Sequence, residues 1–367
     1  MLEIQNLLKT NGVRVVLNKI NVTIDDGEFF CFLGPSGSGK TALMRIIAGL
    51  EKPDSGKILL KGENILKYPA YKRNINTIFS SFALFPDYSL YKNIEYGLNF
   101  KSIGKREKER IINEAIDFFE LSNYIKEDVS TLDNLVKYKI ALCRALICNP
   151  DVLLLDDSLR LLSRKDRIKM RYELKKLQKF LKKTVIYITD NIDNAFTLSD
   201  RIAVMQHGTI HQCAPAYTIY ETPSTYFVAS YISDTNIFYA RIKNFVEGHY
   251  VVELDEGKII ECVTTNKFEV GQELFFALRP ERIKLSYTND NEKFKNYLFG
   301  KIVQKDYRGE YTEYFIELEY GKLIVVAEPN YNFLFNDIDN DNVINFYEVG
   351  ENVYIIWNIM SGNLLYA

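Results

Sequence analysis

The stretch "GPSGSGKT" (Gly34–Thr41) decides the fold of this 367-residue chain. It fits the pattern G-x-x-x-x-G-K-T, follows the apolar run "GEFFCFL", and opens "TALMRIIAGL", whose apolar residues recur at helical spacing. In such a strand–loop–helix unit the glycines let backbone N–H groups wrap phosphates, and the helix N-terminus adds partial positive charge. A chance glycine turn is the alternative, and the order of the flanking elements disfavours it.

The chemistry expected of this loop is the binding of a nucleoside triphosphate together with Mg²⁺. Lys40 would reach the β- and γ-phosphates, and the hydroxyl of Thr41 would be a ligand of Mg²⁺. The phosphate-binding residues predicted from the motif are Gly34, Pro35, Ser36, Gly37, Ser38, Gly39, Lys40 and Thr41.

A second motif, "VLLLDD" (Val152–Asp157), has the pattern of a buried strand that ends in two carboxylates. Asp156 would hold Mg²⁺ through water, and Asp157 stands where a carboxylate could polarise the attacking water. The motif is weak by itself, and it gains weight from the phosphate loop that precedes it.

The composition limits the classes of function. With 47% hydrophobic and 26% charged residues the chain is globular, and a net charge of −2 gives no reason to expect a nucleic-acid partner. The five cysteines show no metal-binding or secreted disulfide spacing and are expected to be reduced thiols. No signal peptide and no apolar run of ~18 residues is evident. Any work at a membrane is therefore expected from the water side.

The chain is predicted to contain two domains. Up to about Ile232, short apolar strands alternate with helical stretches, the pattern of an α/β domain. Beyond it, β-rich runs such as "HYVVELDEGKIIECV" and "ENVYIIWN" are separated by turn residues and predict a small β-barrel. The predicted domains are residues 1–233 and 234–367.

These motifs together resemble the ATP-binding subunit of ABC importers over nearly the whole chain. The segments that carry the resemblance are "LGPSGSGKTALMRIIAGLEKPDSGKI", "SFALFPDYSLYKNIEYGL", "ALCRALICNPDVLLLDDSL" and "AFTLSDRIAVMQHGTI". In the C-terminal part, "ISDTNIFYARI", "ALRPERIKL", "YRGEYTEYFIELEYGKLIVVAE" and "VINFYEVGENVYIIW" are most similar to the spermidine/putrescine type.

The resemblance implies a P-loop ABC-type nucleotide-binding α/β domain, followed by a small all-β, OB-like (TOBE-type) regulatory domain. It implies ATP and Mg²⁺, a peripheral location on the cytoplasmic face of the inner membrane, and two membrane-spanning permease subunits, whose coupling helices the segment Phe82–Leu90 would grip. A second ATP-binding subunit, the same chain or another, would complete the pair. An external polyamine-binding protein would act indirectly.

Several positions depart from the family pattern. Where the family stacks an aromatic residue on adenine, this chain has Asn11, and where it has a lid glutamine, this chain has Ser80. The catalytic glutamate position holds Asp157, which is one methylene shorter, and the switch histidine position holds Asp190. Asp190 would replace a hydrogen-bond donor to the γ-phosphate with an acceptor whose negative charge repels the phosphate.

The family's signature segment L-S-G-G-Q is also altered. Its positions hold Leu132, Asp133, Asn134, Leu135 and Val136, so that a negative charge and side chains stand where backbone donors should approach a γ-phosphate. Asp133 is instead expected to be the N-cap of an amphipathic helix. The D-loop pattern that follows is replaced by Arg160–Ser163.

A last motif, "DIDNDNVINFYE" (Asp337–Glu348), matches the spacing of a calcium loop, but a proline and a predicted strand flank it instead of two helices. An acidic surface loop without calcium is expected. Two functions remain open: the energising subunit of a polyamine-type importer, and a nucleotide-binding but catalytically silent scaffold or sensor. A soluble, translation-type ABC protein is disfavoured by the single nucleotide domain.

Overall fold

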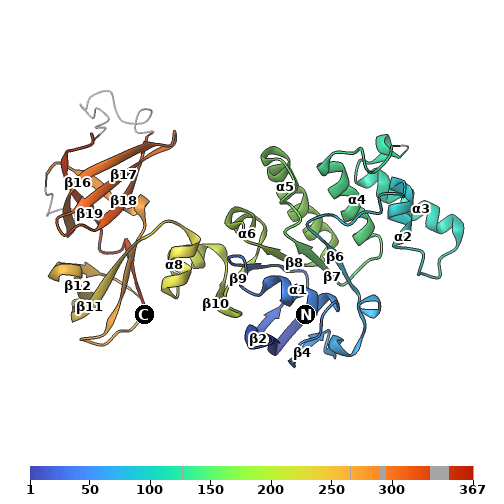
Figure 1. Cartoon of the computed structure of the whole chain (residues 1–367), viewed down its shortest axis with the longest axis horizontal. Coiled ribbons are helices and arrows are strands. Elements are labelled where there is room, and N and C mark those ends of the chain that lie inside the picture. The colour runs from blue at the N-terminus through green and yellow to red at the C-terminus, as the bar shows by residue number, and fades with distance from the viewer. Residues whose placement is uncertain (126, 265, 289–294, 331–346, 367) are drawn as a thin grey trace. The chain divides into compact units, whose positions relative to one another are not determined.

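The structure is a computed structural model that describes residues 1–125, 127–264, 266–288, 295–330 and 347–366. The chain divides into two compact units, Met1–Tyr217 and Thr218–Ala367 (Figure 1). The first is α/β and the second is built mainly of antiparallel strands. The candidate calcium loop lies almost entirely outside the described residues.

A six-stranded sheet forms the centre of the first unit, in the order β10-β9-β3-β8-β7-β6. All neighbours pair in parallel except β10, which pairs antiparallel with β9. Every residue of β3 and β8 is buried, as expected for parallel strands covered on both faces. The strands are β3 (Phe29–Leu33), β6 (Ile75–Ile78), β7 (Val152–Asp156), β8 (Thr184–Thr189), β9 (Arg201–Gln206) and β10 (Thr209–Ala214).

An antiparallel sheet in the order β2-β1-β4-β5 lies beside it and shares its core. Helix α1 (Lys40–Ala48) packs on β6, β7 and β8, and its apolar residues join the same cluster as Leu2 and Ile4 of β1. The phosphate loop is thus held between two sheets. The strands are β1 (Leu2–Asn11), β2 (Arg14–Ile24), β4 (Ser55–Leu60) and β5 (Glu63–Asn64).

Helices complete the first unit. A separate apolar cluster holds together α2 (Leu90–Tyr96), α3 (Lys105–Phe118) and α4 (Asn134–Leu146). Helix α6 (Ile192–Leu198) packs on β3 and β8 and contacts α5 (Arg164–Leu181). Along the described chain, no helix is long and apolar enough to cross a membrane.

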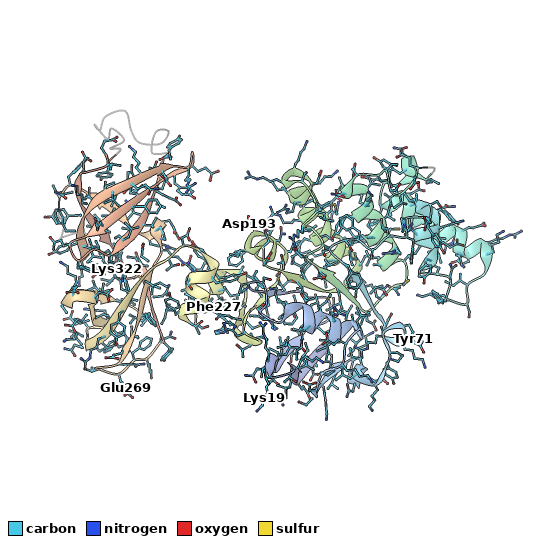
Figure 2. All side chains as sticks on the ribbon, in the orientation of Figure 1. Lys19, Tyr71, Asp193, Phe227, Glu269 and Lys322 are labelled. Carbon is cyan, nitrogen blue, oxygen red and sulfur yellow. The ribbon has the colours of Figure 1, made fainter. Side chains whose placement is uncertain are left out.

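The second unit contains two five-stranded antiparallel sheets that share one core around Trp357. Their orders are β13-β12-β11-β14-β20 and β15-β19-β16-β17-β18. Lys322, labelled in Figure 2, pairs with Asp255 and lies over the ring of Phe238. The strands are β11 (Asn236–Val246), β12 (His249–Leu254), β13 (Ile259–Cys262), β14 (Glu273–Leu278), β15 (Lys284–Ser286), β16 (Asn296–Tyr307), β17 (Tyr311–Leu318), β18 (Leu323–Pro329), β19 (Asn352–Trp357) and β20 (Gly362–Leu365).

Two short helices, α7 (Ala216–Glu221) and α8 (Tyr226–Ile232), are tied to the second unit by Arg279. Its buried guanidinium donates to the carbonyl oxygens of Ala229 at 3.0 Å and Tyr220 at 3.3 Å, and it lies over the Tyr220 ring. Tyr220, Ala229 and Arg279 all lie in the unit that begins at Thr218. The domain boundary after Ser233 stays a prediction. Single 3₁₀ turns are η1 (Ile65–Lys67), η2 (Ala70–Lys72), η3 (Ser122–Tyr124), η4 (Asp255–Gly257) and η5 (Pro280–Arg282).

Candidate functional site

The phosphate loop runs from the end of β3 into α1, and its glycines are required by close packing. A Cβ on Gly34 would lie 2.2 Å from the carbonyl oxygen of Met205, and one on Gly39 would lie 2.6 Å from that of Val16. Gly39, at φ 101°, also has a backbone conformation that other residues avoid. Only glycine therefore allows β2 and β9 to approach the loop this closely.

Lys40 is buried at the first position of α1, only 8% exposed. Its ammonium group donates to the carbonyl oxygens of Gly34 at 2.6 Å and Pro35 at 2.8 Å, and to Oγ of Ser38 at 3.1 Å. Burial lowers the pKa of Lys40, and nearby carboxylates, Asp190 foremost, oppose that shift. A cation is therefore held inside the loop among oxygen atoms.

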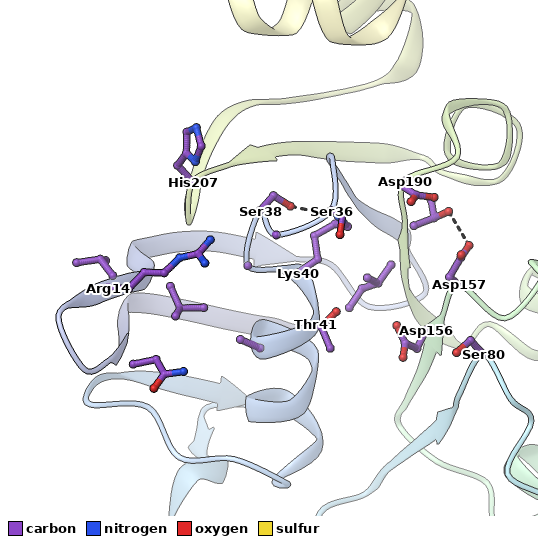
Figure 3. Close-up of a pocket in the computed structure, with 18 of the residues that line it drawn as sticks. Arg14, Ser36, Ser38, Lys40, Thr41, Ser80, Asp156, Asp157, Asp190 and His207 are labelled. Atoms are coloured by element: carbon purple, nitrogen blue, oxygen red, sulfur yellow. Dashed lines mark hydrogen bonds between the residues drawn. The ribbon is translucent and has the colours of Figure 1, made fainter.

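The loop forms one wall of a cavity of about 500 Å³, shown in Figure 3. Other walls come from the carboxyl ends of β6, β7 and β8, where parallel sheets bind their ligands. The residues that line it are Asn11, Arg14, Val15, Val16, Ser36, Gly37, Ser38, Gly39, Lys40, Thr41, Ala42, Ser80, Asp156, Asp157, Arg160, Ile188, Thr189, Asp190 and His207.

Nearly all predicted site residues of the first motifs thus meet in one place. Ser36 to Thr41, Ser80, Asp156, Asp157 and Asp190 line the cavity, whereas Gly34 and Pro35 lie at the base of the loop and accept hydrogen bonds from Lys40. Thr41 and Asp156 present a hydroxyl and a carboxylate to the same space. Such hard oxygen donors suit Mg²⁺.

Asp157 is held firmly at its place beside β8. Its backbone has a φ of 40°, its N–H donates to the carbonyl oxygen of Ile188 at 2.7 Å, and its Oδ1 accepts from Oγ1 of Thr189 at 2.9 Å. Burial raises the pKa of Asp157, and the charge of Asp190 raises it further. Burial and Asp157 likewise raise the pKa of Asp156. Three carboxylates therefore share one end of the cavity.

The cavity also contains residues that the sequence analysis did not assign to the site. Arg160 follows Asp157 on the carboxylate side. On the side away from the carboxylates, Arg14, Val15 and Val16 come from the start of β2, and His207 lies in the turn between β9 and β10. Asn11, predicted at the base-binding position, pairs directly with Arg14 across the hairpin. That pairing was the available signal, because a two-residue turn after Asn11 aligns the two side chains.

The segment from Leu132 to Val136, predicted to be an altered signature, has a structural role within its own unit. Asp133 is the N-cap of α4, and its Oδ1 accepts from the N–H of Val136 at 2.8 Å, which confirms the predicted cap. Leu132 and Val136 are buried in the apolar cluster of the helices, and Asn134 donates to the carbonyl oxygen of Leu161 at 3.0 Å. Within the described chain, the residues from Leu132 to Val136 do not line the cavity.

Comparisons with known proteins agree with this architecture. Residues 17–160 match the ABC transporter family, and residues 276–361 match the TOBE domain. The spermidine/putrescine import ATP-binding protein PotA of Legionella pneumophila (strain Philadelphia 1) is 34% identical over 357 residues, covering 97% of this chain and 96% of that protein. PotA of Haemophilus influenzae (strain Rd) is 36% identical over 358 residues, covering 98% and 94%.

A solved structure supports the same assignment. An ATP-binding cassette described as a dimer in a post-hydrolysis state, bound to ADP and Pi, superimposes with a TM-score of 0.54 at 27% identity. The match covers 59% of this chain and 99% of that one. The predicted fold class, an ABC-type α/β domain followed by an all-β domain, is therefore confirmed. The chain belongs to the ABC transporter family, as an ATP-binding protein that carries a C-terminal TOBE domain.

Proposed function

We propose that this chain is the ATP-binding subunit of a polyamine importer of the spermidine/putrescine type. Two relatives that carry that name align over at least 97% of the chain, so both the nucleotide-binding and the β-rich parts have counterparts in them. The partners would be two membrane-spanning permease subunits, a second ATP-binding subunit and, indirectly, an external polyamine-binding protein. The subunit would work at the cytoplasmic face of the membrane, and no nucleic acid is involved.

MgATP would bind at the phosphate loop. Lys40 would pair with the β- and γ-phosphates, and Thr41 and Asp156 would hold Mg²⁺, whose charge would offset that of the phosphates. Asp157 would orient the attacking water, because its carboxylate is fixed by Thr189 at the same end of the cavity. Ser80 would take the place of the lid glutamine with a much shorter reach.

Hydrolysis in this chain is proposed to be slow. The single observation that carries this proposal is the position of Asp190, whose carboxylate lines the same cavity as Asp156 and Asp157. A third carboxylate opposes a γ-phosphate that the switch histidine would attract. Asp157 adds to the defect, since it is shorter than glutamate and a displacement of ~1 Å can cost on the order of 10²-fold in rate.

The altered signature extends the defect to every pairing of subunits. In ABC dimers each ATP lies between the phosphate loop of one subunit and the signature segment of the other. A homodimer would have two sites that lack the usual glutamate, histidine and signature. With an intact partner, one site would contain Asp157 and Asp190, and the other would face Asp133. Both sites would remain impaired.

A catalytically silent scaffold or sensor is the alternative, and the same carboxylate at position 190 favours it. Reconstitution of the complete complex in proteoliposomes, with spermidine uptake and ATP turnover measured together, separates the two functions. If the chain is the ATP-binding subunit of an importer, we expect spermidine uptake that depends on this chain and slow ATP turnover. Turnover at ordinary transporter rates that Lys40→Ala abolishes would overturn slow hydrolysis. A complex that binds MgATP but transports no spermidine would support the silent subunit.

A further inference from the structure

The hairpin between β1 and β2 brings a cation to the phosphate loop. Asn11 and Arg14 are paired across a two-residue turn whose first residue, Gly12, has a φ of 60°. Arg14 is exposed and lines the cavity on the side away from the three carboxylates (Figure 3). Its side chain therefore approaches the loop from a different strand than Lys40 does.

The start of β2 packs directly against the loop. The carbonyl oxygen of Val16, two residues after Arg14, would lie 2.6 Å from a Cβ on Gly39 and 2.4 Å from one on Gly208. The N–H of Gly208 in turn donates to the carbonyl oxygen of Ser38 at 3.0 Å. The start of β2 is thus fixed relative to the loop by backbone contacts.

The guanidinium of Arg14 lies close to Gly37 of the phosphate loop. Its Nη2 lies 3.9 Å from the position that a Cβ would take on Gly37. In Figure 3 the Arg14 side chain extends toward Ser38. A phosphate cradled by the N–H groups of this loop would come within hydrogen-bond reach of the guanidinium, which matches phosphate oxygens in a bidentate geometry.

The charges that line the cavity also support an anion-binding role for Arg14. Among the described residues that line it, the permanent cations are Lys40, Arg14 and Arg160, and the carboxylates are Asp156, Asp157 and Asp190. Without Arg14, the fixed charge facing an anionic ligand would be negative. Arg14 therefore offsets the additional carboxylate at position 190.

We infer that Arg14 is a second phosphate-binding cation, which contacts the α- and β-phosphates of the nucleotide from the side opposite the carboxylates. This inference rests on the proposed binding of ATP at the phosphate loop. It assigns a binding role to a residue outside the phosphate-loop motif, and the role is independent of the transported substrate.

The test is calorimetric titration of the full chain with MgATP, MgADP and inorganic tripolyphosphate, which has no base. Arg14→Ala is expected to weaken all three by similar factors, roughly 5- to 30-fold, as for a charge-assisted hydrogen bond in a partly solvated site. Arg14→Lys should lose less affinity than Arg14→Ala, because lysine keeps the positive charge. Arg106→Ala, at an exposed arginine of α3, is the matched control and should change nothing.

The outcomes are distinct. If Arg14→Ala lost affinity for ATP and ADP but not for tripolyphosphate, Arg14 would contact the base, and the inference would be overturned. If the variant lost affinity for ATP and tripolyphosphate but not for ADP, a contact of Arg14 with the α- and β-phosphates would be excluded. Unchanged affinities for all three ligands would exclude any contact. If the unmodified chain binds none of the three ligands, the proposed function fails as well.

Discussion

The hydroxyl of Thr189 donates a hydrogen bond of 2.9 Å to Oδ1 of Asp157, across the carboxyl ends of the neighbouring strands β8 and β7. The same hydroxyl accepts from the N–H of Asn191 at 3.0 Å, ahead of α6. Burial raises the pKa of Asp157, and this hydrogen bond acts against that shift. One threonine thus orients the carboxylate that would position water and the turn that carries Asp190.

Replacing Thr189 with valine should destabilise the first unit. The partly buried carboxylate and the N–H of Asn191 would both lose their partner, at a cost of about 1–3 kcal/mol. Urea unfolding of the full chain measures this. Thr189→Ser keeps the hydroxyl and should recover most of the loss. Equal stability of the valine variant and the unmodified chain would mean that the hydrogen bond contributes nothing.

Replacing Lys40 with alanine should weaken MgATP binding at least ~10-fold, because the variant loses a buried cation beside the phosphates. Isothermal titration checks this prediction. Lys57→Ala, at an exposed position of β4, removes the same charge away from the cavity and serves as the control. Unchanged affinity in Lys40→Ala would refute the assignment of the phosphate loop.

Repair of the catalytic positions should be strongly cooperative. Asp157→Glu alone is expected to recover little ATP turnover, because catalytic groups that act as a unit are not additive. Asp190→His should tighten MgATP binding by removing the third carboxylate from the cavity. Joint repair of both residues and of the signature segment should raise turnover far more than any single change. ATP turnover of the assembled complex is the measurement, and full recovery by Asp157→Glu alone would contradict the prediction.

Stability of the second unit should depend on pH through Glu328. Burial raises its pKa, although its Oε1 accepts from the N–H of Leu285 at 2.7 Å. The folded state therefore binds this proton more tightly than the unfolded state. That contribution is present at pH below the ordinary glutamate pKa and is lost as pH rises through the raised value.

Glu328→Gln should accordingly raise the melting temperature at pH 7, and the gain should shrink as the pH falls toward 4. Glutamine still accepts the hydrogen bond from Leu285. Melting curves between pH 4 and 8 give the test, with Glu310→Gln at an exposed position as the control. A gain that stays constant with pH would exclude titration of Glu328 as its cause.

The N-cap of α4 allows a separate test of the structural role of Asp133. Asp133→Ala should cost about 0.5–2 kcal/mol of stability, whereas Asp133→Ser should cost little, because serine also caps helices. Chemical unfolding compares the two variants. Equal destabilisation by both would show that the negative charge, and not the cap, stabilises the helix.

The sequence predicted those parts of the site that local rules determine. The phosphate loop, the end of β7 and the cap at Asp133 each depend on a few consecutive residues. Arg14 and His207 were missed because they are brought to the phosphate loop only by strand pairing and by glycine contacts between distant segments. The helices α7 and α8 likewise join the second unit through Arg279, far along the chain, and no local pattern contains that information.

The close approach of Gly39 and Gly208 to Val16 has a mechanical consequence. At these glycines, backbone atoms of the phosphate loop, the start of β2 and the turn between β9 and β10 lie in direct contact, and close-packed interiors transmit strain. We therefore expect a shift of the loop to be transmitted to the neighbouring hairpin and turn. A methyl group added at either glycine would clash with the carbonyl oxygen of Val16 and push these segments apart.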